Sequence, residues 1–161
     1  MTLVLIGPPG AGKTTVGTIL ATRRGVPFRD TDADIEETAG KSISEIFFDD
    51  GEEHFRALEA AAVAKALAEH DGVLSLGGGA ILAEGTRTLL HGHQVVFLNV
   101  GLSAAAQRVG LNRDRPVLAL NPRASLRTLL EARLPLYREV ASVEILTDGK
   151  TPAQVADEVP V

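Results

Sequence analysis

Residues 7–14 carry the most specific chemical signal in the sequence. They read Gly-Pro-Pro-Gly-Ala-Gly-Lys-Thr, which matches the phosphate-loop pattern G-x-x-x-x-G-K-[ST]. Glycines let the backbone curl so that successive N–H groups point into one concavity and bind phosphate oxygens, and the helix that follows adds its positive end. Lys13 is expected to reach the β- and γ-phosphates, and the Thr14 hydroxyl to ligate Mg²⁺. The pattern predicts a nucleoside triphosphate site.

Acidic residues follow the second predicted strand rather than the third. Many phosphate-loop proteins place the acid that holds Mg²⁺ at the end of a later apolar strand, but here residues 73–76 run into three glycines. The run Asp30-Thr31-Asp32 follows the second strand, and the sequence has no Asn-Lys-x-Asp guanine-reading motif. A small kinase is therefore favoured over a switch GTPase or a large remodelling ATPase. The two aspartates could also merely cap the next helix. For Asp34, surface solvation is the simplest interpretation.

An arginine-rich segment lies in the second half of an acidic chain. Residues 108–138 hold seven Arg against two acids, a local net charge of +5, although the whole chain carries −5. An acidic protein that gathers its arginines in one segment is expected to hold a small anion; a solvated helix face is the alternative. Residues 112–121 fit neither helical nor strand periodicity, and a loop of this length is usually functional or mobile.

The elements that position these residues are short apolar runs alternating with longer helical patterns. Helices are predicted at residues 12–24 and 52–69, and a last helix from Thr151-Pro152 onward. A capping box is predicted at residues 42–45. Strands are predicted for five runs that do not alternate in polarity: residues 3–6, 27–30, 73–76, 94–100 and 143–146. A chain of 161 residues in this order predicts a single three-layer α/β domain with a parallel sheet.

The composition excludes several classes of function. Hydrophobic residues make up 45% and charged residues 23%, so the chain can form a core and is not disordered. A net charge of −5 argues against nucleic acid as a partner, because phosphate-backbone affinity comes from Lys and Arg. The absence of Cys removes disulfides, thiolate metal sites and Cys nucleophiles. No run approaches the roughly 18 apolar residues of a membrane span, so no membrane partner and a cytoplasmic location are expected.

The ordered set of motifs resembles the shikimate kinases over nearly the whole chain. The resemblance implies a P-loop NTPase fold of the nucleoside monophosphate kinase type, with a five-stranded parallel sheet in the order 2-3-1-4-5. It implies one kinase domain over residues 1–161, with a shikimate-binding helical region at about 31–60 and a lid at about 112–121. Besides the phosphate loop, it rests on Asp30-Thr31-Asp32 with Ile35-Glu36, Gly51-Glu52, Phe55-Arg56, Leu76-Gly77-Gly78-Gly79, Arg115-Pro116, and Arg133 followed by Pro135-Leu136-Tyr137.

The same resemblance implies roles for individual residues. Asp32 would accept hydrogen bonds from substrate hydroxyls and draw the proton from the attacking 3-hydroxyl, and Arg115 would close over the phosphates. Arg56 and Arg133 would grip a carboxylate, and Tyr137 is expected to pack. The implied catalytic residues are Lys13, Asp32 and Arg115, and the implied metal-binding residues are Thr14 and, through water, Asp30. The implied ATP-binding residues are Gly10, Ala11, Gly12, Lys13, Thr14, Thr15, Arg115 and Lys150. The implied shikimate-binding residues are Asp32, Arg56, Gly77, Gly78, Gly79 and Arg133.

The activity implied by the resemblance is transfer of the ATP γ-phosphoryl group to the 3-hydroxyl of shikimate, with Mg²⁺ as cofactor. The products would be 3-phosphoshikimate and ADP, on the route to chorismate and the aromatic amino acids. The expected partners are shikimate and ATP, and the expected state is a monomer. Two alternatives stay open. A kinase for gluconate or a nucleoside monophosphate would use the same loop, and gluconate also has a carboxylate. The other alternative is a regulatory module that binds a nucleotide without turnover; such a module would have no need of a second site for a small substrate.

Overall fold

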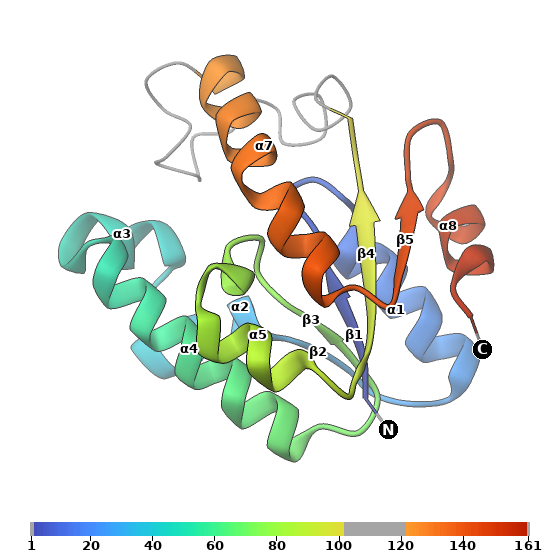
Figure 1. The fold of residues 1–161 in the computed structure, drawn as a ribbon. Helices are drawn as coiled ribbons and strands as arrows, with labels where there is room; N and C mark the ends of the chain where they lie inside the picture. The colour runs from blue at the N-terminus through green and yellow to red at the C-terminus, as the bar shows by residue number, and fades with distance from the viewer. Residues whose placement is uncertain (1, 102–121, 161) are drawn as a thin grey trace.

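A five-stranded parallel sheet forms the centre of the computed structural model, which describes residues 2–101 and 122–160. The strand order is β2-β3-β1-β4-β5, and every neighbouring pair is parallel (Figure 1). This confirms the predicted fold class and strand order. The strands are β1 (Leu3–Ile6), β2 (Phe28–Asp30), β3 (Val73–Ser75), β4 (Gln94–Asn99) and β5 (Val143–Leu146).

Helices cover both faces of the sheet. In Figure 1, α1 and α8 lie on one side, whereas α4, α5 and α7 lie on the other. The helices are α1 (Lys13–Arg24), α2 (Thr31–Ala39), α3 (Ile43–Asp50), α4 (Glu52–Glu69), the short 3₁₀ turn η1 (Ala80–Leu82), α5 (Glu84–Leu90), α7 (Pro122–Val140) and α8 (Pro152–Glu158). No helix in the described part of the chain is long and apolar enough to cross a membrane.

The central strand explains why the sheet needs a helical layer on each side. All four residues of β1 are buried, and successive side chains of a strand point to opposite faces. Leu3 and Leu5 pack in the cluster with α1 and α8, while Val4 and Ile6 pack in the cluster with α4, α5 and α7. Water is thereby excluded from both faces, as the unbroken apolar strands predicted.

A third, smaller cluster ties the helices that follow β2 to one another. It consists of Ile35 from α2, Ile46 from α3 and Phe55 from α4, all buried. The predicted capping box begins α3, because Ser42 accepts from the Glu45 backbone N–H at 3.1 Å and Glu45 accepts from the Ser42 N–H at 3.1 Å. The chain between β2 and β3 is thus a compact helical unit beside the sheet.

Candidate active site

The phosphate loop connects the carboxyl end of β1 to α1, which is where parallel α/β sheets bind ligands. Gly10 and Gly12 take φ values of +83° and +90°, which residues with a Cβ rarely adopt. Helix α1 begins at Lys13 without a side-chain cap, so its positive end faces the loop. The Lys13 ammonium donates to the carbonyl oxygens of Gly7 at 2.7 Å and Pro8 at 3.1 Å. The backbone therefore has the geometry that a phosphate-binding loop requires.

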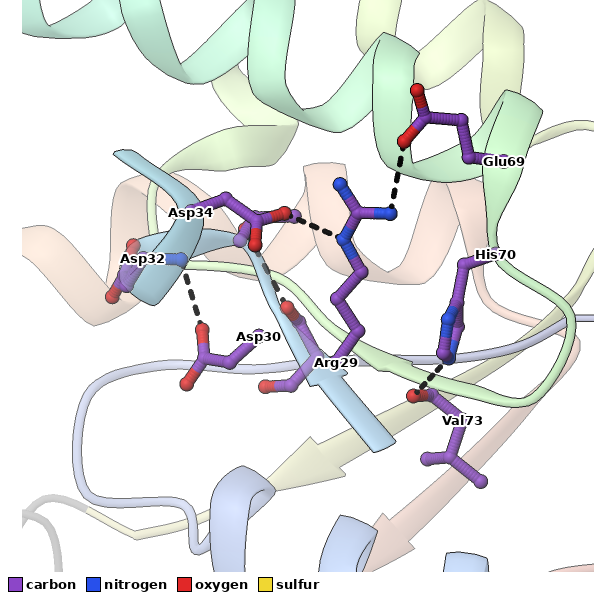
Figure 2. Close-up of polar contacts among 9 residues, drawn as sticks. Arg29, Asp30, Asp32, Asp34, Glu69, His70 and Val73 are labelled. Carbon is purple, nitrogen blue, oxygen red and sulfur yellow. Dashed lines mark hydrogen bonds and ion pairs between the residues drawn. The ribbon is translucent and has the colours of Figure 1, made fainter. Parts of the chain in front are cut away.

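The two residues expected to serve a metal ion lie side by side. The Thr14 hydroxyl donates to Asp30 Oδ2 at 3.3 Å, although the two residues come from different elements. The other carboxylate oxygen of Asp30 accepts from the Asp32 backbone N–H at 2.9 Å and caps α2 (Figure 2). A hydroxyl and a carboxylate at the phosphate end of the loop fit Mg²⁺, which prefers oxygen ligands and takes few of them from protein. The capping interpretation of Asp30 and its metal role are therefore compatible.

A cleft of about 240 Å³ opens on the other side of the loop, between the start of α1 and the turn that leads from β5 into α8. Lys150 lies in this cleft together with the loop, and its ammonium pairs with Glu158 at 2.6 Å. The lining consists of Ala11, Gly12, Thr15, Val16, Thr147, Lys150, Pro152 and Val155. Of the expected ATP-binding residues, Arg115 and the predicted lid at 112–121 fall outside the described residues.

Three glycines after β3 lie between the phosphate loop and the side chains of Asp32 and Arg56. A Cβ on Gly78 would lie 3.0 Å from Pro9 of the loop. On Gly77 it would lie 2.6 Å from Asp32 Oδ1, and on Gly79 it would lie 2.4 Å from Arg56 Nη1. Side chains of ordinary size cannot fit at Gly77 and Gly79 without moving these charged groups. The glycine run therefore brings the predicted substrate residues to the edge of the phosphate loop.

Arg56 on α4 is held in place by neighbours on its own helix. Its Nη1 donates to the carboxylate of Glu59 at 2.7 Å, and its guanidinium carbon lies 5.2 Å from the centre of the Phe55 ring. Glu59 itself is only 3% exposed. Burial raises the pKa of Glu59, the nearby Arg56 opposes this shift, and the Asp32 charge adds to it. Arg56 is thus an ordered cation with a side chain that is only 24% exposed.

Arg133 reaches the same place from α7, on the far side of the glycine run. It is 8% exposed, and its charge is influenced by Arg56 and Glu59 as well as by Tyr137. Burial lowers the pKa of Arg133, while its contacts with Tyr137 and the charge of Glu59 raise it. A buried guanidinium next to a second cation is favourably placed to receive an anion.

Asp34 differs from its predicted role as a solvated surface acid. Its carboxylate pairs with Nε of Arg29 at 2.7 Å, and both side chains are only 24% exposed. Figure 2 shows Arg29 reaching Asp34 on one side and Glu69, at 3.2 Å, on the other. The ion pairs connect β2, α2 and α4. Asp34 therefore stabilises the turn that carries Asp30 and Asp32, which its position in sequence alone does not reveal.

Comparison with known proteins identifies the family. The shikimate kinase family model matches residues 9–160. A shikimate kinase from Salinispora arenicola is 62% identical over 156 residues, which cover 97% of this chain and 93% of the relative. One from Saccharopolyspora erythraea is 62% identical over 157 residues, covering 97% of this chain and 90% of the relative. The chain belongs to the shikimate kinase family.

Structural comparison agrees with this membership of the shikimate kinases, which are ATP-dependent kinases. The structure of the Acinetobacter baumannii shikimate kinase in complex with shikimate has a TM-score of 0.94 and 39% sequence identity, covering 98% of this chain and 89% of the other. A gluconokinase from Sinorhizobium meliloti has a TM-score of only 0.59 at 21% identity, covering 98% and 87% of the two chains. The second similarity shows a shared fold alone, so the gluconate alternative loses its support.

Two side chains beside the predicted substrate residues were not among the predicted site residues. Glu59 lies three positions after Arg56 on α4, a spacing that places both on one helix face. Tyr137 lies four positions after Arg133 on α7 and was expected only to pack. Helical spacing could have found both once Arg56 and Arg133 were chosen. The family resemblance implied that Arg56 and Arg133 act together, but it did not indicate that Glu59 and Tyr137 would accompany them.

Proposed function

We propose that the chain transfers the γ-phosphoryl group of ATP to the 3-hydroxyl of shikimate, giving 3-phosphoshikimate and ADP. One observation carries the proposal above all others: the glycine run 77–79 touches Pro9 of the phosphate loop on one side and the charged groups of Asp32 and Arg56 on the other. A hydroxyl bound beside Asp32 and Arg56 would therefore lie next to the terminal phosphate. Phosphoryl transfer needs such positioning and charge stabilisation more than covalent help from the protein.

Arg56 and Arg133 are proposed to bind the shikimate carboxylate. A planar guanidinium grips a carboxylate through two parallel hydrogen bonds, and buried charge-assisted bonds of this kind are stronger than neutral ones. Both guanidinium groups are held before any ligand arrives, because Arg56 bonds to Glu59 and Arg133 is buried on α7. Little side-chain freedom is then lost on binding.

Asp32 is proposed to accept hydrogen bonds from the substrate hydroxyls and to take the proton of the attacking 3-hydroxyl. It is half-buried in the first turn of α2, and its Oδ1 lies at the surface of Gly77. Asp30 fixes this turn by capping it at the Asp32 backbone N–H. Asp32 thus comes from a capped first turn and lies against the glycine run, where a base for the hydroxyl is needed.

Mg²⁺ is the proposed cofactor, with Thr14 and, through water, Asp30 as its protein partners. When bound, the ion would neutralise charge that accumulates on the phosphate oxygens. Lys13 at the start of α1 would contribute a second positive charge there. Among the described residues, no group of three or more His, Asp or Glu could hold a metal by itself. That fits an ion whose remaining ligands are phosphates and water.

The remaining parts of the proposal concern organisation. Residues 31–60 would form the shikimate-binding region and residues 112–121, with Arg115, a lid over the phosphates. A monomer is the proposed state, and the cytoplasm is the proposed location. Size-exclusion chromatography with light scattering tests the monomer, and hydrogen exchange of 112–121 with and without both ligands tests the lid.

A coupled assay of ADP release tests the reaction itself. Shikimate, gluconate and AMP are offered separately with ATP and Mg²⁺, and the product from shikimate is analysed by ³¹P NMR. Turnover with shikimate alone, abolished by EDTA and restored by Mg²⁺, is expected. Turnover with gluconate or AMP and none with shikimate would overturn the assignment. Phosphate on another hydroxyl would refute the 3-position.

A further inference from the structure

The hydroxyl of Tyr137 lies between two parts of the proposed shikimate site. It donates a hydrogen bond to the carbonyl oxygen of Gly78 at 2.5 Å, across 59 positions of sequence. Tyr137 also lies one turn after Arg133 on α7, and the nearby phenol raises the pKa of that guanidinium. The phenol O–H therefore bonds to the glycine run, while the phenol oxygen keeps a lone pair for the Arg133 guanidinium beside it.

The Tyr137 ring is held rigidly enough to fix the position of its hydroxyl. The residue is 1% exposed, and its ring stacks on Phe97 of β4 with centroids 4.8 Å apart and planes 23° apart. Burial raises the pKa of Tyr137 to about 12, against the opposing effect of Arg133. The phenol therefore keeps its proton at any working pH and remains a donor to Gly78.

The carbonyl that accepts this bond belongs to an otherwise pliable piece of backbone. Gly78 and Gly79 flank one peptide unit, and glycines rotate about φ and ψ more freely than other residues. Because a peptide unit is planar and trans, fixing the Gly78 carbonyl direction also fixes the Gly79 N–H in the opposite direction. Gly79 is the residue against which the Arg56 guanidinium packs. An anchored carbonyl thus sets the surface presented to Arg56.

Arg133 needs an anchor of a different kind. It is buried, and both its own desolvation and the charge of Arg56 act against its positive charge. A long side chain with like charge nearby would otherwise turn away and lose the geometry that paired hydrogen bonds to a carboxylate require. The phenol oxygen can accept from one guanidinium N–H and leave the others for a ligand.

We propose that Tyr137 is a positioning residue for shikimate: its single hydroxyl orients both the Arg133 guanidinium and the Gly78–Gly79 peptide. The inference rests on the proposed function, because it assumes that these two groups bind the substrate. It predicts that losing the hydroxyl alone impairs shikimate recognition and leaves the phosphate loop, and hence ATP binding, intact.

Tyr137→Phe tests the proposal, with Thr2→Val as the matched control. Thr2 also donates one hydrogen bond from a buried hydroxyl to a distant carbonyl, that of His70 at 2.6 Å, but it precedes β1 at the end of the sheet away from the phosphate loop. Both variants lose one such bond, so both are expected to melt at a lower temperature. Kinetics are measured well below every melting temperature, and shikimate affinity is measured by calorimetry.

For Tyr137→Phe, we expect the shikimate KM and Kd to rise about tenfold, with kcat changed less than about threefold and the ATP KM within about twofold. Thr2→Val should leave all of these unchanged. Combining Tyr137→Phe with Arg133→Ala should raise the shikimate Kd by less than the product of the single effects, because part of the tyrosine's effect passes through Arg133.

Three results would overturn the inference: an unchanged shikimate KM and Kd in Tyr137→Phe, an equal rise of the KM for both substrates, or the same shikimate defect in Thr2→Val. If the two effects on the shikimate Kd simply multiply in the double variant, Tyr137 does not act through Arg133. A wild-type chain with no shikimate turnover would refute the proposed function. An active wild-type chain with an unaffected Tyr137→Phe variant refutes the positioning role alone.

Discussion

Gly79→Ala should separate substrate recognition from folding. The new Cβ would lie 2.4 Å from Arg56 Nη1, 2.6 Å from Nη2 and 2.7 Å from the guanidinium carbon, whereas ordinary contacts begin at 3.4 Å. The guanidinium must therefore retreat by about 1 Å. Its retreat disturbs the 2.7 Å bond to Glu59 and moves the proposed grip on the shikimate carboxylate.

The expected effects on stability and on activity have different magnitudes. The backbone at Gly79, with φ −102° and ψ 5°, is open to alanine, and the obstructing atoms are the end of a flexible side chain. Alanine also lowers the entropy of the unfolded chain, so the free energy of unfolding should change by less than about 1 kcal/mol. A 1 Å misplacement in a binding site can cost about 10²-fold. We expect the shikimate KM to rise about 10- to 100-fold, or about 1.4–2.7 kcal/mol.

The assay is steady-state ADP release with each substrate varied in turn, together with denaturant unfolding. Gly85→Ala is the matched control, because a Cβ there meets nothing within 4 Å and the residue lies in helix α5. That variant should keep wild-type kinetics and gain up to about 1 kcal/mol of stability. An unchanged shikimate KM in Gly79→Ala would refute the reasoning, since Arg56 would then not need its observed position.

Three further outcomes are expected. Lys13→Ala should lower kcat by about 10³-fold or more, because the positive charge that the lysine supplies to the phosphates is lost. Calorimetry should still detect shikimate binding, because the residues proposed to bind shikimate are unchanged. Turnover at the wild-type rate in this variant would contradict the expectation. For Glu59→Gln, denaturant titrations at several pH values should find that the wild type gains stability relative to the variant as pH falls. Burial raises the pKa of Glu59 in the folded state above its usual 4.5, so the extra stability is complete only below pH 4.5. The opposite trend would mean that the charge of Arg56 outweighs the desolvation of Glu59. Asp34→Ala should lower the free energy of unfolding by about 1 kcal/mol through loss of its half-buried ion pair with Arg29, and a stability equal to wild type would show that the pair contributes nothing.

Local features of the site could be predicted because neighbouring residues determine them. The phosphate loop needs only its own glycines and the start of the next helix, and Gly10 and Gly12 adopt the expected positive φ values. The capping boxes at Ser42 and Thr151 likewise depend on residues three positions apart. The strand order followed from the family resemblance and not from periodicity, because apolar runs show that strands are buried without showing which strands pair.

Contacts between distant elements could not be predicted in this way. Asp34 was expected in solvent because nothing adjacent in sequence indicated that Arg29 would turn toward it. Glu59 is helical and charged, which typically means exposure, yet it is buried beneath the glycine run. Both outcomes depend on how α2 and α4 pack beside the sheet, and packing is a property of the whole chain.

The sequence by itself determined a phosphate-binding loop, an α/β class with apolar strands, and the residue types that suit a small anionic substrate. The tertiary structure decided which of those residues meet. Arg56 on α4 and Arg133 on α7 are 77 positions apart in sequence, and Tyr137 reaches Gly78 across 59 positions. The physical reason is that turns, caps and amphipathic faces arise from local sterics and hydrogen bonding, whereas a pocket between layers forms only when both faces of the sheet are covered and side chains settle against one another.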